Sequence, residues 1–128
     1  MDIEEQVCNK ELAMRIDKLG VKQESLWYWV GSQVLYKDNK LRLANAVDMP
    51  LQEYSAYTVA ELGELLPNTI IFKGKIYFLI TWKCENRFGV RYKTNKKPDC
   101  LPAQIAVTEA NARAKMLIYL IENKLIKI

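Results

Sequence analysis

The feature that most constrains how this chain folds is a period-two pattern of side chains between residues 68 and 94. Large apolar side chains recur at every second position, and the pattern is interrupted near Gly74 and near Asn86. Such alternation is typical of β-strands, because successive side chains point to opposite faces of a sheet. We therefore predict antiparallel strands joined by turns at residues 73–75 and 85–87.

The alternation also predicts which side chains face the core. On the first long strand the uniformly apolar row is assigned inward: Ile76, Phe78, Ile80, Trp82 and Cys84. The other row is assigned outward: Lys75, Tyr77, Leu79, Thr81 and Lys83. On the returning strand, Phe88, Val90 and Tyr92 are assigned to the core, and Arg87, Gly89, Arg91 and Lys93 to the opposite side. If the apolar rows of both strands align, the cations meet on one exposed surface.

The charge of the chain is concentrated in the same segment. Residues 73–97 hold eight Lys or Arg and one acidic residue, whereas residues 1–72 hold seven and eleven. Cations neutralise phosphates and aromatic rings stack on bases, so this surface is a candidate for nucleic-acid binding. The candidate residues are Lys75, Tyr77, Lys83, Arg87, Arg91 and Lys93. The alternatives are an ordinary solvated face, or a face covered by a helix, which Leu79 in the outward row would favour.

Residues 25–37 are rich in aromatic side chains and are predicted to form a strand that is apolar on both faces. Asp38 and Asn39 suit a turn into a further strand over residues 40–43. Trp and Tyr are common anchors of protein interfaces. Three of these side chains are therefore candidates for binding a protein partner or a second copy of the chain: Trp27, Trp29 and Tyr36. The competing interpretation is that these rings fill the core.

Helical patterns stand at both ends of the chain and once between them. Residues 3–19 predict an amphipathic helix ended by Gly20, and Thr108 is expected to cap a long C-terminal helix. Thr58 and Glu61 have the spacing of a capping box that begins a short helix. Together these patterns predict a single α+β domain over residues 1–128, with an antiparallel sheet packed against the N- and C-terminal helices and one short helix beside it. A sheet with helices on both faces is the variant left open.

The composition argues against ordinary enzyme chemistry. The chain has no histidine, which is the commonest general base and metal ligand, and its five glycines form no phosphate-binding motif. Its three cysteines have no CxxC spacing, and Cys8 and Cys84 are expected to be small buried side chains. Glu61 and Glu64 are close enough to hold a magnesium ion, but solvated charges explain them more simply. We predict a protein that is not an enzyme and that uses no cofactor or metal.

The sequence also bears on location. No apolar run reaches the ~18 residues needed to cross a bilayer, and the acidic residues 1–5 lack the basic start of a signal peptide. An odd number of widely spaced cysteines is not a disulfide framework. We therefore predict a cytoplasmic protein with no membrane partner.

Three stretches carry a resemblance to a known group of proteins. They read LGVKQESLWYW over residues 19–29, AYTVAELGELLP over residues 56–67, and EANARAKMLIYLIEN over residues 109–123. These stretches, about a third of the chain, resemble a family of small uncharacterised proteins encoded in bacterial prophages and related mobile elements. The resemblance implies a bacterial cytosol and a phage-derived gene, and it implies no activity and no catalytic residue.

Overall fold

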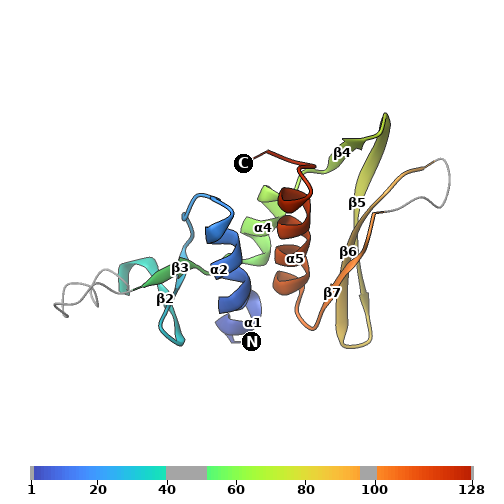
Figure 1. Ribbon diagram of the computed structural model, residues 1–128. Coiled ribbons are helices and arrows are strands. Elements are labelled where there is room, and N and C mark those ends of the chain that lie inside the picture. Colours follow the sequence, from blue (N-terminus) through green and yellow to red (C-terminus); the bar gives the residue numbers. More distant parts are fainter. Residues whose placement is uncertain (1, 40–51, 96–100, 128) are drawn as a thin grey trace.

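The computed structural model describes residues 2–39, 52–95 and 101–127, and its elements form three layers. A small sheet, a middle layer of helices and a larger sheet follow one another across the molecule (Figure 1). The α+β class predicted from the sequence is confirmed. The strands form two antiparallel sheets rather than the single sheet that was expected.

The N-terminal helix predicted over residues 3–19 is interrupted. It consists of α1 (Ile3–Gln6) and α2 (Lys10–Lys18). Between them the Cys8 N–H donates to the Tyr57 carbonyl at 2.9 Å, and the Asn9 side chain accepts from the Leu12 N–H at 2.9 Å. Because Asn at an N-cap satisfies one of the free amides at the start of a helix, a new helix begins there.

The predicted helix ends are confirmed. The Val21 N–H donates to the Ile16 carbonyl at the end of α2, and Gly20 has a φ of 87°. Thr58 and Glu61 form both bonds of a capping box at the start of α4 (Val59–Leu65). The Thr108 side chain caps the first turn of α5 (Glu109–Glu122), in which small alanines are fully buried.

The small sheet has the strand order β2-β1-β3. Its strands are β1 (Trp27–Val30), β2 (Gln33–Tyr36) and β3 (Glu53–Ser55). The strand predicted over residues 25–37 is therefore a hairpin, since the chain reverses at Gly31, whose φ of 61° suits a tight turn. The strand predicted over residues 40–43 lies outside the described residues.

The large sheet confirms the strands and turns predicted from the alternation. All of its pairs are antiparallel and its order is β4-β5-β6-β7. Its strands are β4 (Thr69–Phe72), β5 (Lys75–Cys84), β6 (Arg87–Lys93) and β7 (Gln104–Ala106). Two-residue turns at Lys73-Gly74 and Glu85-Asn86 join the first three strands, with positive φ at Lys73, Gly74 and Glu85.

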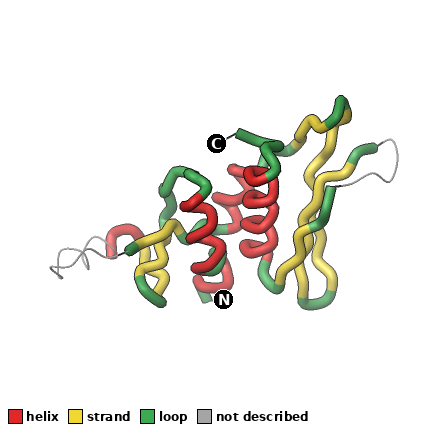
Figure 2. Tube along the Cα trace, in the orientation of Figure 1, coloured by secondary structure: helices red, strands yellow, loops and turns green. Residues whose placement is uncertain are grey.

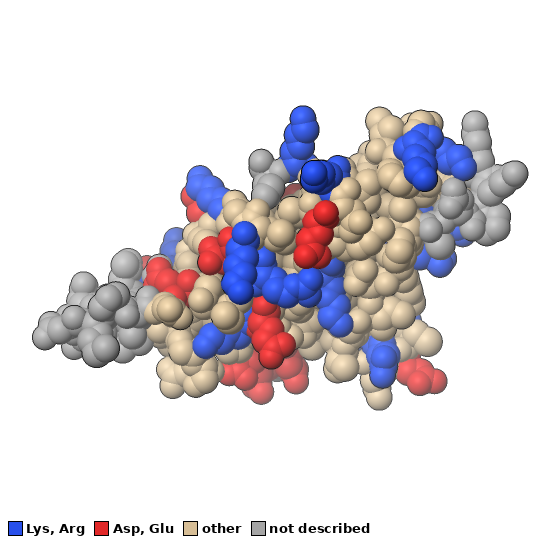
Figure 3. All heavy atoms as spheres, in the orientation of Figure 1, with Lys and Arg blue, Asp and Glu red and all other residues tan. Residues whose placement is uncertain are grey.

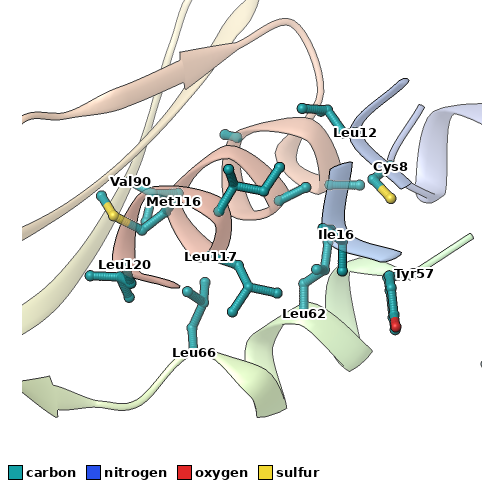
Figure 4. Packing of buried hydrophobic residues seen from close by; sticks show 14 of the residues in the cluster. Cys8, Leu12, Ile16, Tyr57, Leu62, Leu66, Val90, Met116, Leu117 and Leu120 are labelled. Carbon is teal, nitrogen blue, oxygen red and sulfur yellow. The ribbon is translucent and has the colours of Figure 1, made fainter. Parts of the chain in front are cut away.

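The core lies between the helices and one face of the large sheet. Figure 4 shows Leu117 of α5 beside Leu62 of α4 and Leu66, the residue that follows α4, with Ile16 of α2 close by. From β6 the core receives Val90 and Tyr92, both fully buried, and the Tyr92 hydroxyl donates to the Pro67 carbonyl at 2.6 Å. Among the described elements, α5 lies directly against this face of the large sheet and no helix covers the other face, whereas α2 packs on α5 and on β3 of the small sheet (Figure 2).

Candidate functional site

The large sheet has an inner face against the helices and an outer face turned away from them (Figure 2). Buried residues of the inner face include Ile70, Tyr77, Val90 and Tyr92. The outer face follows from the strand register and comprises Thr69, Ile71, Ile76, Phe78, Ile80, Trp82, Cys84, Arg87, Gly89, Arg91, Lys93 and Ile105. Several of its apolar side chains are exposed: Ile71 by 73%, Ile76 by 52%, Ile105 by 46% and Phe78 by 40%.

The face assignment made from the sequence was wrong for β5. The row predicted to face the core (Ile76, Phe78, Ile80, Trp82 and Cys84) lies on the outer face. The turn before β6 has two residues, so Cys84 pairs with Arg87 and Trp82 with Gly89. Directly paired side chains share a face, and this register therefore places the apolar row of β5 beside the cations of β6.

The six candidate nucleic-acid-binding residues divide between the two faces. Arg87, Arg91 and Lys93 share the outer face, as predicted. The other three, Lys75, Tyr77 and Lys83, belong to the inner row. Tyr77 is only 3% exposed and its ring lies 6.3 Å from that of Phe72, so it is a core side chain and cannot stack on a base.

Lys75 and Lys83 are both exposed, at opposite ends of β5. Their separation of eight residues corresponds to roughly 26 Å in an extended strand. These two lysines therefore do not form one cluster with the cations of the outer face.

A tryptophan and an arginine form the centre of the outer face. The Trp82 indole lies across Gly89, where an added Cβ atom would come within 2.2 Å of the ring. The Arg91 guanidinium carbon lies 5.4 Å from the centre of the same ring. The buried Nε of Arg91 has no hydrogen-bond partner among the described residues. The Trp82 ring thus holds the Arg91 guanidinium on the outer face.

The outer face carries positive charge without acidic side chains among its twelve named residues. In the part of the chain that the structure describes, Arg87, Arg91 and Lys93 form no ion pair with a carboxylate. Figure 3 shows acidic side chains mainly over the helices and the small sheet, whereas basic ones prevail over the large sheet. Negative ligands are therefore the ones that this face favours.

The candidate protein-interface residues of the small sheet are partly core residues. Trp29 is 9% exposed, and its indole N–H donates to the Cys8 carbonyl at 2.8 Å, so it attaches the small sheet to the helices. Its prediction as an exposed anchor was wrong. Trp27 and Tyr36 are half-buried and pack edge to face, with ring centres 5.4 Å apart.

The two carboxylates considered for catalysis, Glu61 and Glu64, differ in their surroundings. Glu61 accepts from the Ser25 hydroxyl at 2.7 Å and from the Leu26 N–H at 3.2 Å, in addition to its role in the capping box. Glu64 lines a hollow of about 640 Å³, together with residues that follow α2 and residues 126–127. Within the described residues, no group of three Cys, Asp or Glu side chains is placed to hold a metal ion.

The cysteines have contrasting positions. Cys8 is buried, and burial raises the pKa of its thiol to about 12, which makes it a poor nucleophile. Cys84 is exposed at the end of β5, so the prediction that it is buried was wrong. Cys100 lies outside the described residues.

Comparisons of the chain with protein-family models, curated proteins and solved structures gave no match. The resemblance to prophage-encoded proteins and the cytoplasmic location therefore stay predictions. Across residues 2–39, 52–95 and 101–127, the helices are too short or too polar to span a bilayer. The residues that sequence reasoning missed are Phe78 and Trp82, and the length of the turn after Cys84 is the signal that reveals them.

Proposed function

We propose that this protein is a binding protein rather than an enzyme, and that it binds single-stranded nucleic acid across the outer face. The observation that carries the proposal is the pairing of two rows of side chains. On β6, Lys93 and Arg91 lie directly opposite Phe78 and Ile80 of β5. A cationic row therefore runs beside an aromatic and aliphatic row on a face that no described element covers.

The cationic row suits a phosphate backbone. Arg87 and Lys93 are six residues apart, which corresponds to roughly 20 Å of extended strand. Arg91 lies between them, and its planar guanidinium donates several hydrogen bonds in a geometry that matches phosphate oxygens. Its guanidinium carbon lies 5.4 Å from the centre of the Trp82 ring, which keeps the cation on this face.

The apolar row suits bases. Phe78 is 40% exposed on this face, and aromatic stacking contributes about 1–3 kcal/mol per base in single-strand binding proteins. The guanidinium of Arg91, supported by Trp82, offers a second plane on which a base stacks. In a duplex the bases already stack on one another, so an apolar face of this kind favours single strands.

Fluorescence anisotropy of labelled oligonucleotides tests the proposal. The wild-type protein is expected to bind single-stranded DNA or RNA at low salt, more tightly than a duplex of the same length. The double charge reversal Arg91→Glu/Lys93→Glu is expected to weaken binding roughly tenfold or more and to flatten the dependence on salt. The matched control is Lys18→Glu/Lys37→Glu, which makes the same charge change at two exposed lysines outside the large sheet.

Circular dichroism checks that both variants remain folded. The proposal fails if the wild-type protein binds no oligonucleotide at low salt. It also fails if both double variants lose the same affinity, because binding would then depend on net charge and not on this face.

Docking of a protein partner on the same face is the second candidate function. The observation that favours it is a set of exposed aliphatic side chains. Ile71, Ile76 and Ile105 are exposed on this face, and they offer no aromatic plane for stacking on a base. Contiguous exposed apolar surface of this kind often marks a protein interface. If the anisotropy experiment shows no oligonucleotide binding, nucleic-acid binding is excluded and docking of a protein partner becomes the favoured function.

A further inference from the structure

Strand β5 is longer than the strand beside it, which leaves part of its edge open. β4 pairs with residues 75–78, and the last bond on that side runs from the Leu79 N–H to the Asn68 carbonyl at 2.9 Å. On the other side β6 pairs with β5 as far as Cys84. Residues 80–84 therefore have a strand neighbour on one side only among the described residues (Figure 1).

The backbone groups at this open edge belong to Thr81 and Lys83. In an antiparallel sheet, the N–H and C=O of one residue point to the same side and those of the next residue point to the other. The backbone N–H of Leu79 points toward β4. The backbone N–H and C=O groups of Thr81 and Lys83 therefore point to the same side, beyond the end of β4. Two donors and two acceptors are thus presented in a row, as in a template for a further strand.

The lysine on this edge does not cover it. Lysines commonly protect open edges from pairing, but here the Lys83 ammonium lies 5.4 Å from the centre of the Phe88 ring. Phe88 of β6 is the residue paired with Lys83 of β5. The lysine side chain is therefore directed toward β6 and away from the open edge.

We propose that two copies of this chain pair through residues 80–84 in antiparallel orientation, centred on Trp82. In this register Thr81 of each copy lies opposite Lys83 of the other, and their backbone groups form four hydrogen bonds. Trp82 lies opposite Trp82 of the second copy, and Ile80 lies opposite Cys84 of the second copy.

Three observations favour a second copy as the occupant. The open stretch is symmetric about Trp82 in its pattern of edge groups, so it is complementary to itself. Asn68 limits the open stretch at one end and the turn at Glu85 limits it at the other. The same five residues of a second copy therefore fit between these limits. The register also keeps the two Lys83 side chains from lying directly opposite each other, which like charges disfavour.

The consequence concerns the outer face. A two-fold axis perpendicular to the sheet joins two four-stranded sheets into one and places both outer faces on the same side. Each copy then contributes its Trp82 to the centre of one continuous surface. This inference rests on the strand edge and not on the proposed ligand, so it is tested without nucleic acid.

A cysteine cross-link tests the register. In a non-hydrogen-bonded antiparallel pair the two Cα atoms are about 4.5 Å apart, which suits a disulfide. Ile80→Cys is therefore expected to form a disulfide-linked dimer with the native Cys84 of a second copy when oxidised glutathione accepts the two electrons. Peptide mapping by mass spectrometry identifies the linked residues. The control Ile80→Cys/Cys84→Ser keeps the new thiol and is expected to form no such link.

Blocking the edge tests the pairing itself. Thr81→Pro removes an N–H that points to the open side and leaves the bonds to β6 intact. Sedimentation equilibrium is expected to show concentration-dependent dimers for the wild-type protein and association weakened roughly tenfold or more in the variant.

The inference is overturned by a wild-type protein that stays monomeric at sub-millimolar concentration. It is also overturned by an Ile80→Cys variant whose cross-links do not join residues 80 and 84 of different copies. If Thr81→Pro fails to fold, the cross-link alone decides.

Discussion

The inner and outer faces of the large sheet are made by the same four strands, yet among the described elements only the inner face is covered by helix. Ile70 and Ile71 on β4 are neighbours with identical side chains, and they are 5% and 73% exposed. Full burial of such a side chain stabilises a protein by about 1.5–3 kcal/mol. The inner face therefore contributes to stability, whereas the outer face leaves several apolar side chains in water. An uncovered surface of that kind is expected where a ligand or partner binds.

The largest expected effect comes from comparing these two isoleucines directly. Ile70→Ala removes a buried side chain from the core and is expected to lower the free energy of unfolding by about 2–4 kcal/mol. Ile71→Ala makes the same chemical change on the outer face and is expected to cost about 0.5 kcal/mol or less. Urea denaturation followed by circular dichroism measures both. Equal losses would mean that the outer face is covered after all.

A smaller effect is expected where Trp82 crosses Gly89. Gly89→Ala places a methyl group against the indole and is expected to cost about 1–3 kcal/mol, because the ring must move. The same substitution in a Trp82→Ala background is expected to cost little, so the two changes should not be additive. Denaturation of the two single variants and the double variant at low protein concentration completes this cycle. Additive losses would contradict the close packing of Trp82 on Gly89.

Much of the fold followed from local sequence signals. The capping box at Thr58, the N-cap at Thr108 and the turn at Gly74 depend on side-chain and backbone preferences that are readable within a few residues. The break between α1 and α2 was missed because it depends on a distant partner: the Cys8 N–H bonds to Tyr57, far along the chain. The same reason explains why the strands were not assigned to two separate sheets.

The candidate site was predicted only in part because β5 is apolar on both faces. Its more apolar row was assigned to the core, although Tyr77 and Leu79 of the other row are the side chains that pack there. A turn of three residues would have aligned the rows as expected, but the observed turn has two, and a slip of one residue exchanges the faces. The cations Arg87, Arg91 and Lys93 were grouped correctly because they lie on a single strand.

The smallest effect on stability is expected from modifying the cysteine of the outer face. Cys84 is exposed, so iodoacetamide at neutral pH is expected to alkylate it in the native protein and to change the free energy of unfolding by about 0.5 kcal/mol or less. Cys8 is buried and its pKa is raised to about 12, so it is expected to react only after unfolding. Mass spectrometry of digested protein distinguishes the two sites. Native alkylation of Cys8 at the rate of Cys84 would show that the helical side opens as readily as the outer face, and the contrast between the two environments would not hold.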